Sequence, residues 1–184
     1  CGKPVKMEEE YCVVCREGGH YFTEGRSIFP YGEIWRQSLI RFKYYGCREY
    51  GDFYAKAMSV YGRRYLERWK PQLIVPVPLH PAKKRMRGFN QAAYLAERLS
   101  CYTGIPWTDS LVLKIRNTRS QKKLDALQRR NNLRKAYEVT HKLDDISILV
   151  VDDVYTTGST MDAMAICLTE AGAQAVYFLT VCAG

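Results

Sequence analysis

Residues 146–160 read ISILVVDDVYTTGST, and this stretch decides the fold class. The run from Ile146 to Val151 is apolar without alternation, which is typical of a strand buried on both faces of a parallel sheet. Asp152 and Asp153 follow it directly, and a helical pattern begins after the turn. A strand, a turn and a helix in this order predict a parallel α/β sheet, whose ligand crevice lies at the carboxyl ends of its strands.

The turn combines acids, hydroxyls and a glycine. Asp152 and Asp153 place two carboxylate acceptors at the strand end, where they suit the vicinal hydroxyls of a ribose. Residues 156–160 (TTGST) offer hydroxyls and backbone N–H groups at the positive end of a helix, a nest sized for one phosphate. A Walker loop needs Gly-Lys-Ser/Thr, so this turn is of another kind. The alternative is an Asp-rich turn with a helix N-cap and no ligand.

Further strands and helices alternate around this unit. We expect strands at 73–77, 111–115 and 175–181, and helices at 33–44, 49–69, 89–102, 124–135 and from 161 to about 171. The aromatic side chains of the 49–69 helix are interpreted as packing. The chain is thus predicted to form a helix-flanked parallel α/β domain over residues 31–184, after a small cysteine-containing module over residues 1–30.

The composition is that of a globular protein, with 184 residues, 47% of them hydrophobic. No apolar run approaches the roughly 20 residues of a membrane span, and no signal peptide is visible, so we expect a cytoplasmic protein. The net charge of +9 is concentrated in residues 83–87 and 114–135, which leave the rest slightly acidic. This pattern suits a compact polyanion such as a diphosphate, and also nucleic acid.

Three of the seven cysteines, Cys1, Cys12 and Cys15, crowd the N-terminus, and the last two form a CxxC motif. Such knuckles typically hold a structural zinc with four thiolates. Because the chain begins at Cys and not at Met, we expect a leading cysteine just upstream, with His20 a weaker fourth ligand. The alternative is free, reduced thiols, as is usual in a cytosol.

LVVDDVYTTGST (Leu149–Thr160) resembles the phosphoribosyl-pyrophosphate (PRPP) signature of type I phosphoribosyltransferases. The resemblance implies that Asp152 and Asp153 bind the ribose 2′- and 3′-hydroxyls. It also implies a set of residues that hold the 5′-phosphate: Tyr155, Thr156, Thr157, Gly158, Ser159 and Thr160.

PVPLHPAKKRMRGFNQA (76–92) and RNTRSQKKLDALQRRNNLRKAY (116–137) are similar to the ComF-type competence proteins, a family with an N-terminal cysteine zinc ribbon. By this resemblance the pyrophosphate-binding residues are Leu79, His80, Lys84, Arg85 and Arg87. A lid segment that covers the site would contain Arg116, Thr118, Gln121, Arg129 and Asn132. The alternatives are a solvated loop or DNA contact for 83–87, and a solvated helix face for 114–135.

The resemblance implies transfer of the phosphoribosyl group of PRPP to an unknown, usually nitrogen, acceptor, with Mg²⁺ arriving on the diphosphate. Thr156 stands where some purine-salvage relatives carry an Asp general base, and the phenol of Tyr155 is a poor substitute, so the catalytic base is unassigned. The alternatives are a non-catalytic PRPP- or nucleotide-binding regulator and a nucleic-acid accessory protein in DNA uptake. The expected partners are therefore PRPP, a small-molecule acceptor, DNA or a DNA-uptake protein, and a second copy of the chain.

Overall fold

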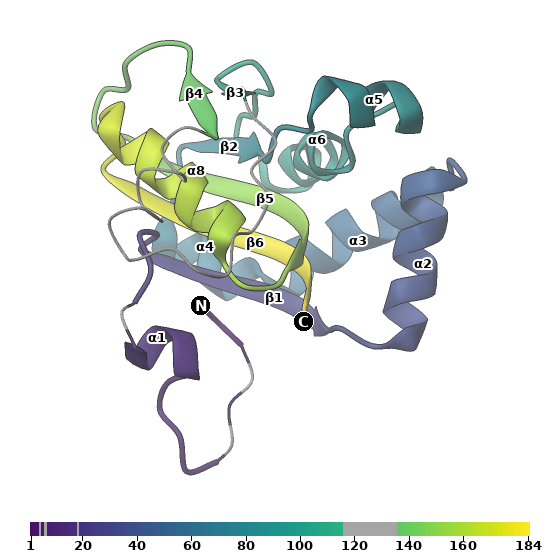
Figure 1. Ribbon diagram of the computed structural model, residues 1–184, viewed down its shortest axis with the longest axis horizontal. Helices are drawn as coiled ribbons and strands as arrows, with labels where there is room; N and C mark the ends of the chain where they lie inside the picture. The colour runs from purple at the N-terminus through teal and green to yellow at the C-terminus, as the bar shows by residue number, and fades with distance from the viewer. Residues whose placement is uncertain (4, 6, 18, 116–135) are drawn as a thin grey trace.

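The computed structural model describes residues 1–3, 5, 7–17, 19–115 and 136–184. Its main sheet has four parallel strands in the order β1-β6-β5-β2 (Figure 1). The bounds are β1 Glu24–Pro30, β2 Leu73–Pro76, β5 Ser147–Tyr155 and β6 Ala175–Ala183. Because all four strands run the same way, their carboxyl ends share one edge of the sheet. The predicted parallel α/β class is confirmed.

Helices cover both faces of this sheet (Figure 1). The helices of the described residues are α1 Val13–Glu17, α2 Glu33–Tyr44, α3 Arg48–Tyr61, α4 Arg63–Trp69, α5 Pro81–Arg87, α6 Gln91–Thr103 and α8 Ser159–Glu170. Of these, α8 covers one face of the sheet, and α2, α3, α4 and α6 cover the other. A separate antiparallel pair joins β3 Val112–Lys114 to β4 Tyr137–Val139. No helix within the described ranges has the length and apolar character that crossing a bilayer requires.

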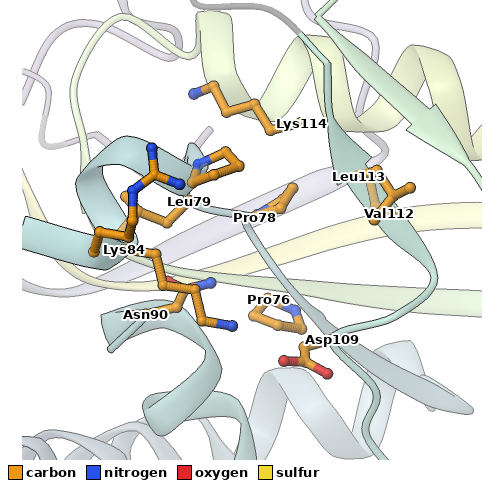
Figure 2. A pocket seen from close by; sticks show the side chains of 11 residues that line it. Pro76, Pro78, Leu79, Lys84, Asn90, Asp109, Val112, Leu113 and Lys114 are labelled. Carbon is orange, nitrogen blue, oxygen red and sulfur yellow. The ribbon is translucent and has the colours of Figure 1, made fainter. Parts of the chain in front are cut away.

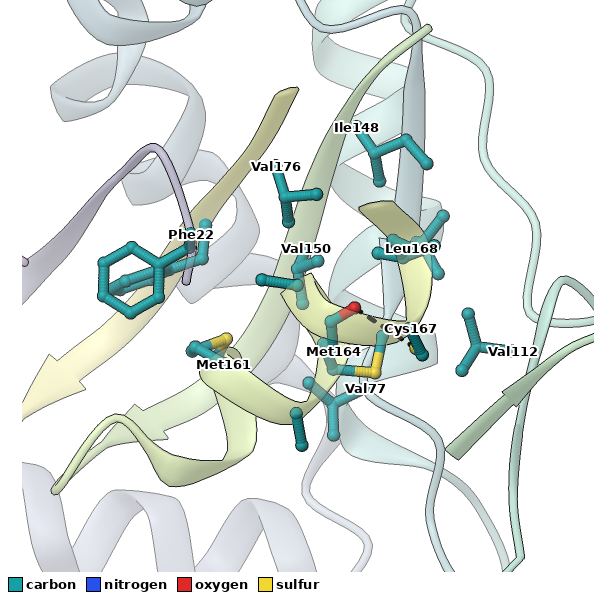
Figure 3. Packing of buried hydrophobic residues seen from close by; sticks show 14 of the residues in the cluster. Phe22, Val77, Val112, Ile148, Val150, Met161, Met164, Cys167, Leu168 and Val176 are labelled. Atoms are coloured by element: carbon teal, nitrogen blue, oxygen red, sulfur yellow. Dashed lines mark hydrogen bonds between the residues drawn. The ribbon is translucent and has the colours of Figure 1, made fainter. Parts of the chain in front are cut away.

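Alternate side chains of β5 enter two different hydrophobic cores. Ile148 and Val150 pack with Met164 and other residues of α8 on one face (Figure 3). Leu149 and Val151 pack on the other face with buried residues of α2, α3, α4 and α6. Burial on both faces explains why this strand is apolar without alternation.

Two predicted elements differ from the structure. The single helix expected over 49–69 is divided into α3 and α4 at Gly62, where a Cβ would lie 2.3 Å from the carbonyl oxygen of Met58. The strand expected at 111–115 exists as β3, but it pairs with β4 and lies outside the parallel sheet. The helix expected at 124–135 lies outside the described residues.

The predicted module boundary between residues 30 and 31 does not coincide with the edge of the sheet. Residues 24–30 form β1, which pairs with β6 in parallel. The sheet-forming part of the chain therefore begins at Glu24. Before it, α1 lies apart from the sheet (Figure 1), whereas Phe22 packs in the main core. The strand escaped prediction because its sequence, EGRSIFP, is neither continuously apolar nor cleanly alternating.

Gly25 of β1 provides a test of this pairing. A Cβ at this position would lie 1.9 Å from Phe178, whose fully buried ring stacks on Tyr155 at 4.7 Å and has no room to move. We expect Gly25→Ala to lower the free energy of unfolding by about 3 kcal/mol in urea denaturation. The control is Gly32→Ala, where a Cβ meets nothing within 4 Å. Equal unfolding midpoints for the two variants would contradict the β1 position.

Candidate functional site

The carboxylates of Asp152 and Asp153 lie at the shared carboxyl edge of the sheet. Strand β5 continues to Tyr155, so the two residues occupy successive strand positions, and their carboxyl groups lie close enough to interact. The carboxylate of Asp153 forms an ion pair with Lys43 of α2, and both side chains are largely buried. The backbone N–H of Asp153 donates to Asp152 Oδ1 at 2.9 Å.

Lys43 was not among the predicted site residues. The helix that carries it was predicted correctly at 33–44, but β1, which precedes this helix and ends at the carboxyl edge, was not. Without β1, nothing in the sequence places the end of α2 beside Asp153.

The electrostatics of this edge disfavour two negative charges. Burial raises the pKa of Asp152 well above its ordinary value, the charge of Asp153 raises it further, and Lys43 opposes both effects. Burial also lowers the pKa of Lys114, helped by Lys83, while Asp152 opposes the shift. The edge therefore favours a ligand that brings positive charge or hydrogen-bond donors to Asp152, because either relieves an unfavourable buried charge.

The predicted phosphate loop forms the turn between β5 and α8, as its sequence indicated. Gly158 is the N-cap of α8 with a left-handed φ of 84°, and it brings no side-chain cap. Around it the side chains of Thr156, Thr157, Ser159 and Thr160 are exposed, and the Thr157 and Ser159 hydroxyls lie 2.9 Å apart. The Thr157 hydroxyl also accepts a hydrogen bond from the Ser159 N–H at 3.4 Å. The exposed hydroxyls and the helix N-terminus make this turn suitable for an anion.

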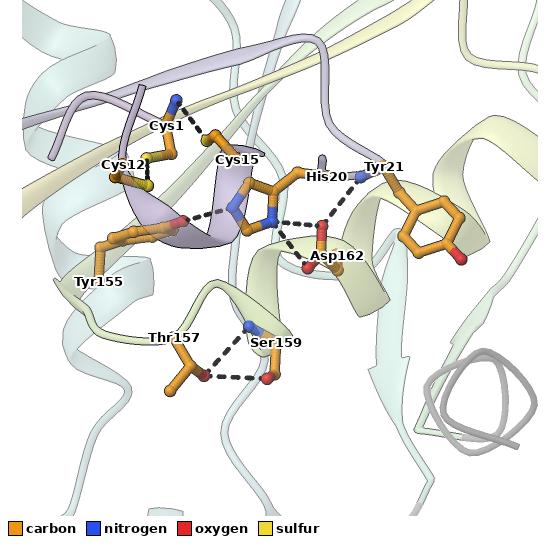
Figure 4. A network of polar contacts seen from close by, with 9 residues as sticks. All are labelled: Cys1, Cys12, Cys15, His20, Tyr21, Tyr155, Thr157, Ser159 and Asp162. Atoms are coloured by element: carbon orange, nitrogen blue, oxygen red, sulfur yellow. Dashed lines mark hydrogen bonds and ion pairs between the residues drawn. The ribbon is translucent and has the colours of Figure 1, made fainter. Parts of the chain in front are cut away.

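The side chain of Tyr155 is turned away from the exposed hydroxyls of this turn, and its part in binding the 5′-phosphate stays a prediction. Its ring is buried and stacks on Phe178, because β5 still alternates at this position and turns it into the core. Its hydroxyl lies 3.2 Å from Nε2 of His20 (Figure 4). Burial raises the pKa of Tyr155, in agreement with the expectation that this phenol is not a base.

The predicted pyrophosphate loop contains a short helix, α5. Leu79, Lys84 and Arg85 line a pocket of about 490 Å³ together with Asn90 of the α6 N-cap and Lys114 of β3 (Figure 2). This pocket lies at the end of β2, beside the carboxyl edge. The structure thus brings three of the five predicted pyrophosphate residues together around one pocket, whose charged lining is Lys84, Arg85, Lys114 and Asp109.

His80 and Arg87 have other contacts. Nδ1 of His80 accepts a hydrogen bond from the N–H of Ala82 at 3.3 Å and caps α5. The guanidinium of Arg87 donates to the Tyr44 hydroxyl and to Gln91 Oε1, each at 2.8 Å, and does not line the pocket. That Arg87 faces a diphosphate stays a prediction, and in this structure its side chain is bonded to Tyr44 at the end of α2. The predicted lid residues Arg116, Thr118, Gln121, Arg129 and Asn132 lie outside the described residues.

The thiols of Cys1, Cys12 and Cys15 form a cluster whose sulfur atoms all lie within 4.8 Å of one another (Figure 4). The Cys1 and Cys12 sulfurs are 3.4 Å apart. Two thiolate sulfurs bound to one tetrahedral zinc are separated by a similar distance, about 3.8 Å. Three soft donors at this spacing fit a zinc ion. His20 is not the fourth ligand, because both of its ring nitrogens face Tyr155 and Asp162, and that prediction is corrected.

Comparison with known proteins identifies the family to which this domain is similar. Residues 54–184 match the family described as "Phosphoribosyl transferase domain". The chain is 34% identical over 109 residues to Competence protein F of Haemophilus influenzae, which covers 58% of this chain and 48% of that protein. It is 35% identical over 112 residues to the DNA utilization protein YhgH of Salmonella typhi, which covers 61% and 49%. The chain therefore spans about half the length of these two relatives.

Two further matches extend over most of the chain. Competence protein ComFC of Bacillus subtilis is 29% identical over 193 residues, which cover 95% of this chain and 72% of that protein. Among solved structures, the purine phosphoribosyltransferase from Pyrococcus horikoshii is similar at 18% identity and a TM-score of 0.45, over 73% of this chain and 83% of that one.

Proposed function

Because the chain belongs to the phosphoribosyl transferase domain family, as a relative of the ComF-type competence proteins, we propose that its carboxyl edge binds PRPP. One observation carries this proposal: a pair of carboxylates at the end of a buried strand leads directly into a hydroxyl-lined helix N-terminus. In this arrangement Asp152 and Asp153 accept the ribose 2′- and 3′-hydroxyls. The turn at 156–160 takes the 5′-phosphate, and Lys84 and Arg85 face the diphosphate.

The proposed reaction is transfer of the phosphoribosyl group to an acceptor nitrogen. The bond from C1 to the pyrophosphate oxygen breaks, a bond from C1 to nitrogen forms, and the nitrogen gives up one proton to solvent water. Positive charge develops on the sugar ring in the transition state, as in glycoside cleavage. Lys84, Arg85 and Lys114 stabilise the departing pyrophosphate from the lining of the pocket. Mg²⁺, bound with the diphosphate, supplies charge neutralisation on the leaving group.

Calorimetry with PRPP and Mg²⁺ tests the binding site. We expect saturable binding by the native chain, and absence of heat at millimolar PRPP would overturn the proposal. Release of pyrophosphate in the presence of a panel of amines and nucleobases then separates a transferase from a regulator that binds PRPP without turnover. The small-molecule acceptor and a second copy of the chain stay predicted partners.

We also propose that the cysteine cluster holds a structural zinc in a protein of the cytoplasm. Removing one of three clustered thiolates is expected to lower the zinc content sharply, because a tetrahedral site loses its geometry with a ligand. Mass spectrometry of the metal in purified Cys12→Ser and native protein measures this. Cys101→Ser is the matched control, because Cys101 is exposed and outside the cluster. Equal zinc in Cys12→Ser and native protein would contradict the assignment.

A second candidate role, in DNA handling, is favoured by an arginine cluster on β1 and α4. The guanidinium groups of Arg26, Arg64 and Arg68 lie 4.9, 4.5 and 5.5 Å from the ring centre of Tyr65, around a hollow of about 350 Å³. Glu24 offsets part of this charge through its ion pairs with Arg26 and Arg68. Cations beside an aromatic ring are typical of sites for single-stranded nucleic acid.

Salt-dependent binding of single-stranded DNA tests this second role. We expect an Arg64→Ala/Arg68→Ala variant to bind more weakly and to show a shallower salt dependence. Arg63→Ala is the control, because Arg63 is paired with Glu67 at 2.8 Å and lies outside the hollow. Binding that disappears with Asp152→Asn instead would assign the DNA affinity to the PRPP site.

A further inference from the structure

A continuous hydrogen-bonded network joins the N-terminal segment to the turn that precedes α8 (Figure 4). The Tyr155 hydroxyl lies 3.2 Å from Nε2 of His20, and Nδ1 of His20 lies 3.0 Å from Oδ2 of Asp162, in the first turn of α8. The backbone N–H of Tyr21 donates to Oδ1 of the same carboxylate at 2.9 Å. The side chains of His20 and Asp162 are 4% and 13% exposed, so the contact between them is largely shielded from solvent.

The imidazole of His20 also packs directly against the phosphate loop. A Cβ on Gly158 would lie 2.7 Å from His20 Cε1 and 2.7 Å from the Tyr155 hydroxyl. Phe22 stacks on the imidazole at 4.5 Å and holds its plane. In Figure 4, Thr157 extends on the other side of the loop from His20, so the imidazole supports the loop without occupying its open side.

The network also fixes the position of the negatively charged Asp162 carboxylate. Asp162 lies in the first turn of α8, the same helix end that is proposed to hold the 5′-phosphate. A carboxylate there competes with a bound anion for the helix N-terminus and repels it. The hydrogen bonds to His20 and to the Tyr21 N–H hold the carboxylate toward the N-terminal segment.

We infer that His20 is a positioning residue for the 5′-phosphate: it supports the backbone turn at Gly158 and holds the Asp162 carboxylate away from the anion. This inference rests on the proposed PRPP site. It extends that site to a residue of the N-terminal segment, which lies before the matched domain of residues 54–184. A preorganised turn binds an anion more tightly, because the loop does not need to be ordered on binding.

The test compares two fragments of PRPP. We expect His20→Ala to bind ribose 5-phosphate and PRPP about 10-fold more weakly in calorimetry, while binding of pyrophosphate with Mg²⁺ stays unchanged. A parallel loss for both fragments would show a general loss of fold and overturn a positioning role. His141→Ala is the control, because His141 is exposed and its Nδ1 lies 3.0 Å from the hydroxyl of the adjacent Thr140.

Conservative variants keep the test informative where His20→Ala folds poorly. The amide of Asn in His20→Asn is able to replace Nδ1 toward Asp162, so we expect this variant to regain part of the ribose 5-phosphate affinity. Tyr155→Phe removes only the hydroxyl and is expected to weaken ribose 5-phosphate binding less than His20→Ala does. The inference would be overturned if His20→Asn regained none of the affinity for ribose 5-phosphate and Tyr155→Phe kept the native affinity for it.

A readout without ligand separates this inference from the proposed function. Hydrogen exchange of the amides at 157–162 is expected to be faster in His20→Ala than in the native chain, whether or not PRPP binds. Failure of the native chain to bind PRPP, with this faster exchange, would overturn the proposed function and leave the support of the loop by His20 standing. Native PRPP binding with unchanged exchange and unchanged ribose 5-phosphate affinity in His20→Ala would overturn the inference alone.

Discussion

Asp152→Asn is expected to weaken PRPP binding about 100-fold and to stabilise the unliganded protein at the same time. The loss of affinity follows from the proposed contact between this carboxylate and a ribose hydroxyl, since an amide is a weaker acceptor than a carboxylate. The gain in stability follows from burial and the adjacent charge of Asp153, which raise the pKa of Asp152 and make its ionised form unfavourable in the fold. The two effects have opposite signs, which a general disruption of the structure does not produce.

The pH dependence of stability gives a second measurement of the same residue. With its pKa raised in the folded state, Asp152 costs no stability below its unfolded pKa of about 3.9, where it is protonated in both states. Stability is then lost as the pH rises from there through the folded pKa. The stability gap between Asp152→Asn and the native protein is therefore expected to be small near pH 3.5 and largest at neutral pH.

Urea denaturation across this pH range, with PRPP calorimetry at neutral pH, checks both effects. Asp144→Asn is the control, because Asp144 is exposed and precedes β5, at the opposite end of the strand from the carboxyl edge. A less stable Asp152→Asn protein at neutral pH would contradict the electrostatic argument. An unchanged affinity for PRPP would contradict the proposed ribose contact.

Gly158→Ala is expected to lower the affinity for ribose 5-phosphate by about 100-fold. The backbone φ of 84° strains any residue with a side chain. The added Cβ would also lie 2.7 Å from both His20 Cε1 and the Tyr155 hydroxyl, so the turn has to move away from them. Displacement of the turn changes the direction of the N–H groups proposed to bind the phosphate.

Gly104→Ala separates the two causes. Gly104 has a φ of 73°, similar to that of Gly158, but a Cβ there meets nothing within 4 Å. We expect Gly104→Ala to cost about 1 kcal/mol of unfolding free energy from backbone strain, with native affinity for ribose 5-phosphate. A Gly158→Ala protein that matches Gly104→Ala in both measurements would show that the close packing under the loop has no effect on the ligand.

The centre of the site was readable from the sequence because its signals are local. An apolar run, two acids and a glycine before a helical pattern are neighbours in the chain, and the structure has β5, the turn and α8 in that order. The basic run at residues 83–87 is also a local signal, and it predicted that Lys84 and Arg85 contribute to an anion-binding pocket. Whether a given cation of that run faces the pocket did not follow, since Arg87 is held by Tyr44 through a tertiary contact.

The parts that were missed depend on contacts between distant segments. His20 and Asp162 are 142 residues apart, so no spacing signals their hydrogen bond. Likewise Tyr155 comes two residues after Asp153 and reads as part of the loop, and only the continuation of β5 shows that its ring is turned inward. These residues need the fold, because each acquires its role from a neighbour that the chain supplies much earlier or later.

The order of the strands also constrains how the chain reaches its fold. Among the described strands, β1 has β6 as its sheet neighbour, and Ser27 bonds to Thr180 across 153 residues. During synthesis β1 therefore leaves the ribosome long before β6 has been made. Until then its backbone N–H and C=O groups have no strand to pair with. Such distant pairings make folding slow, and the final docking of β1 against β6 is expected to coincide with closure of the His20 contact.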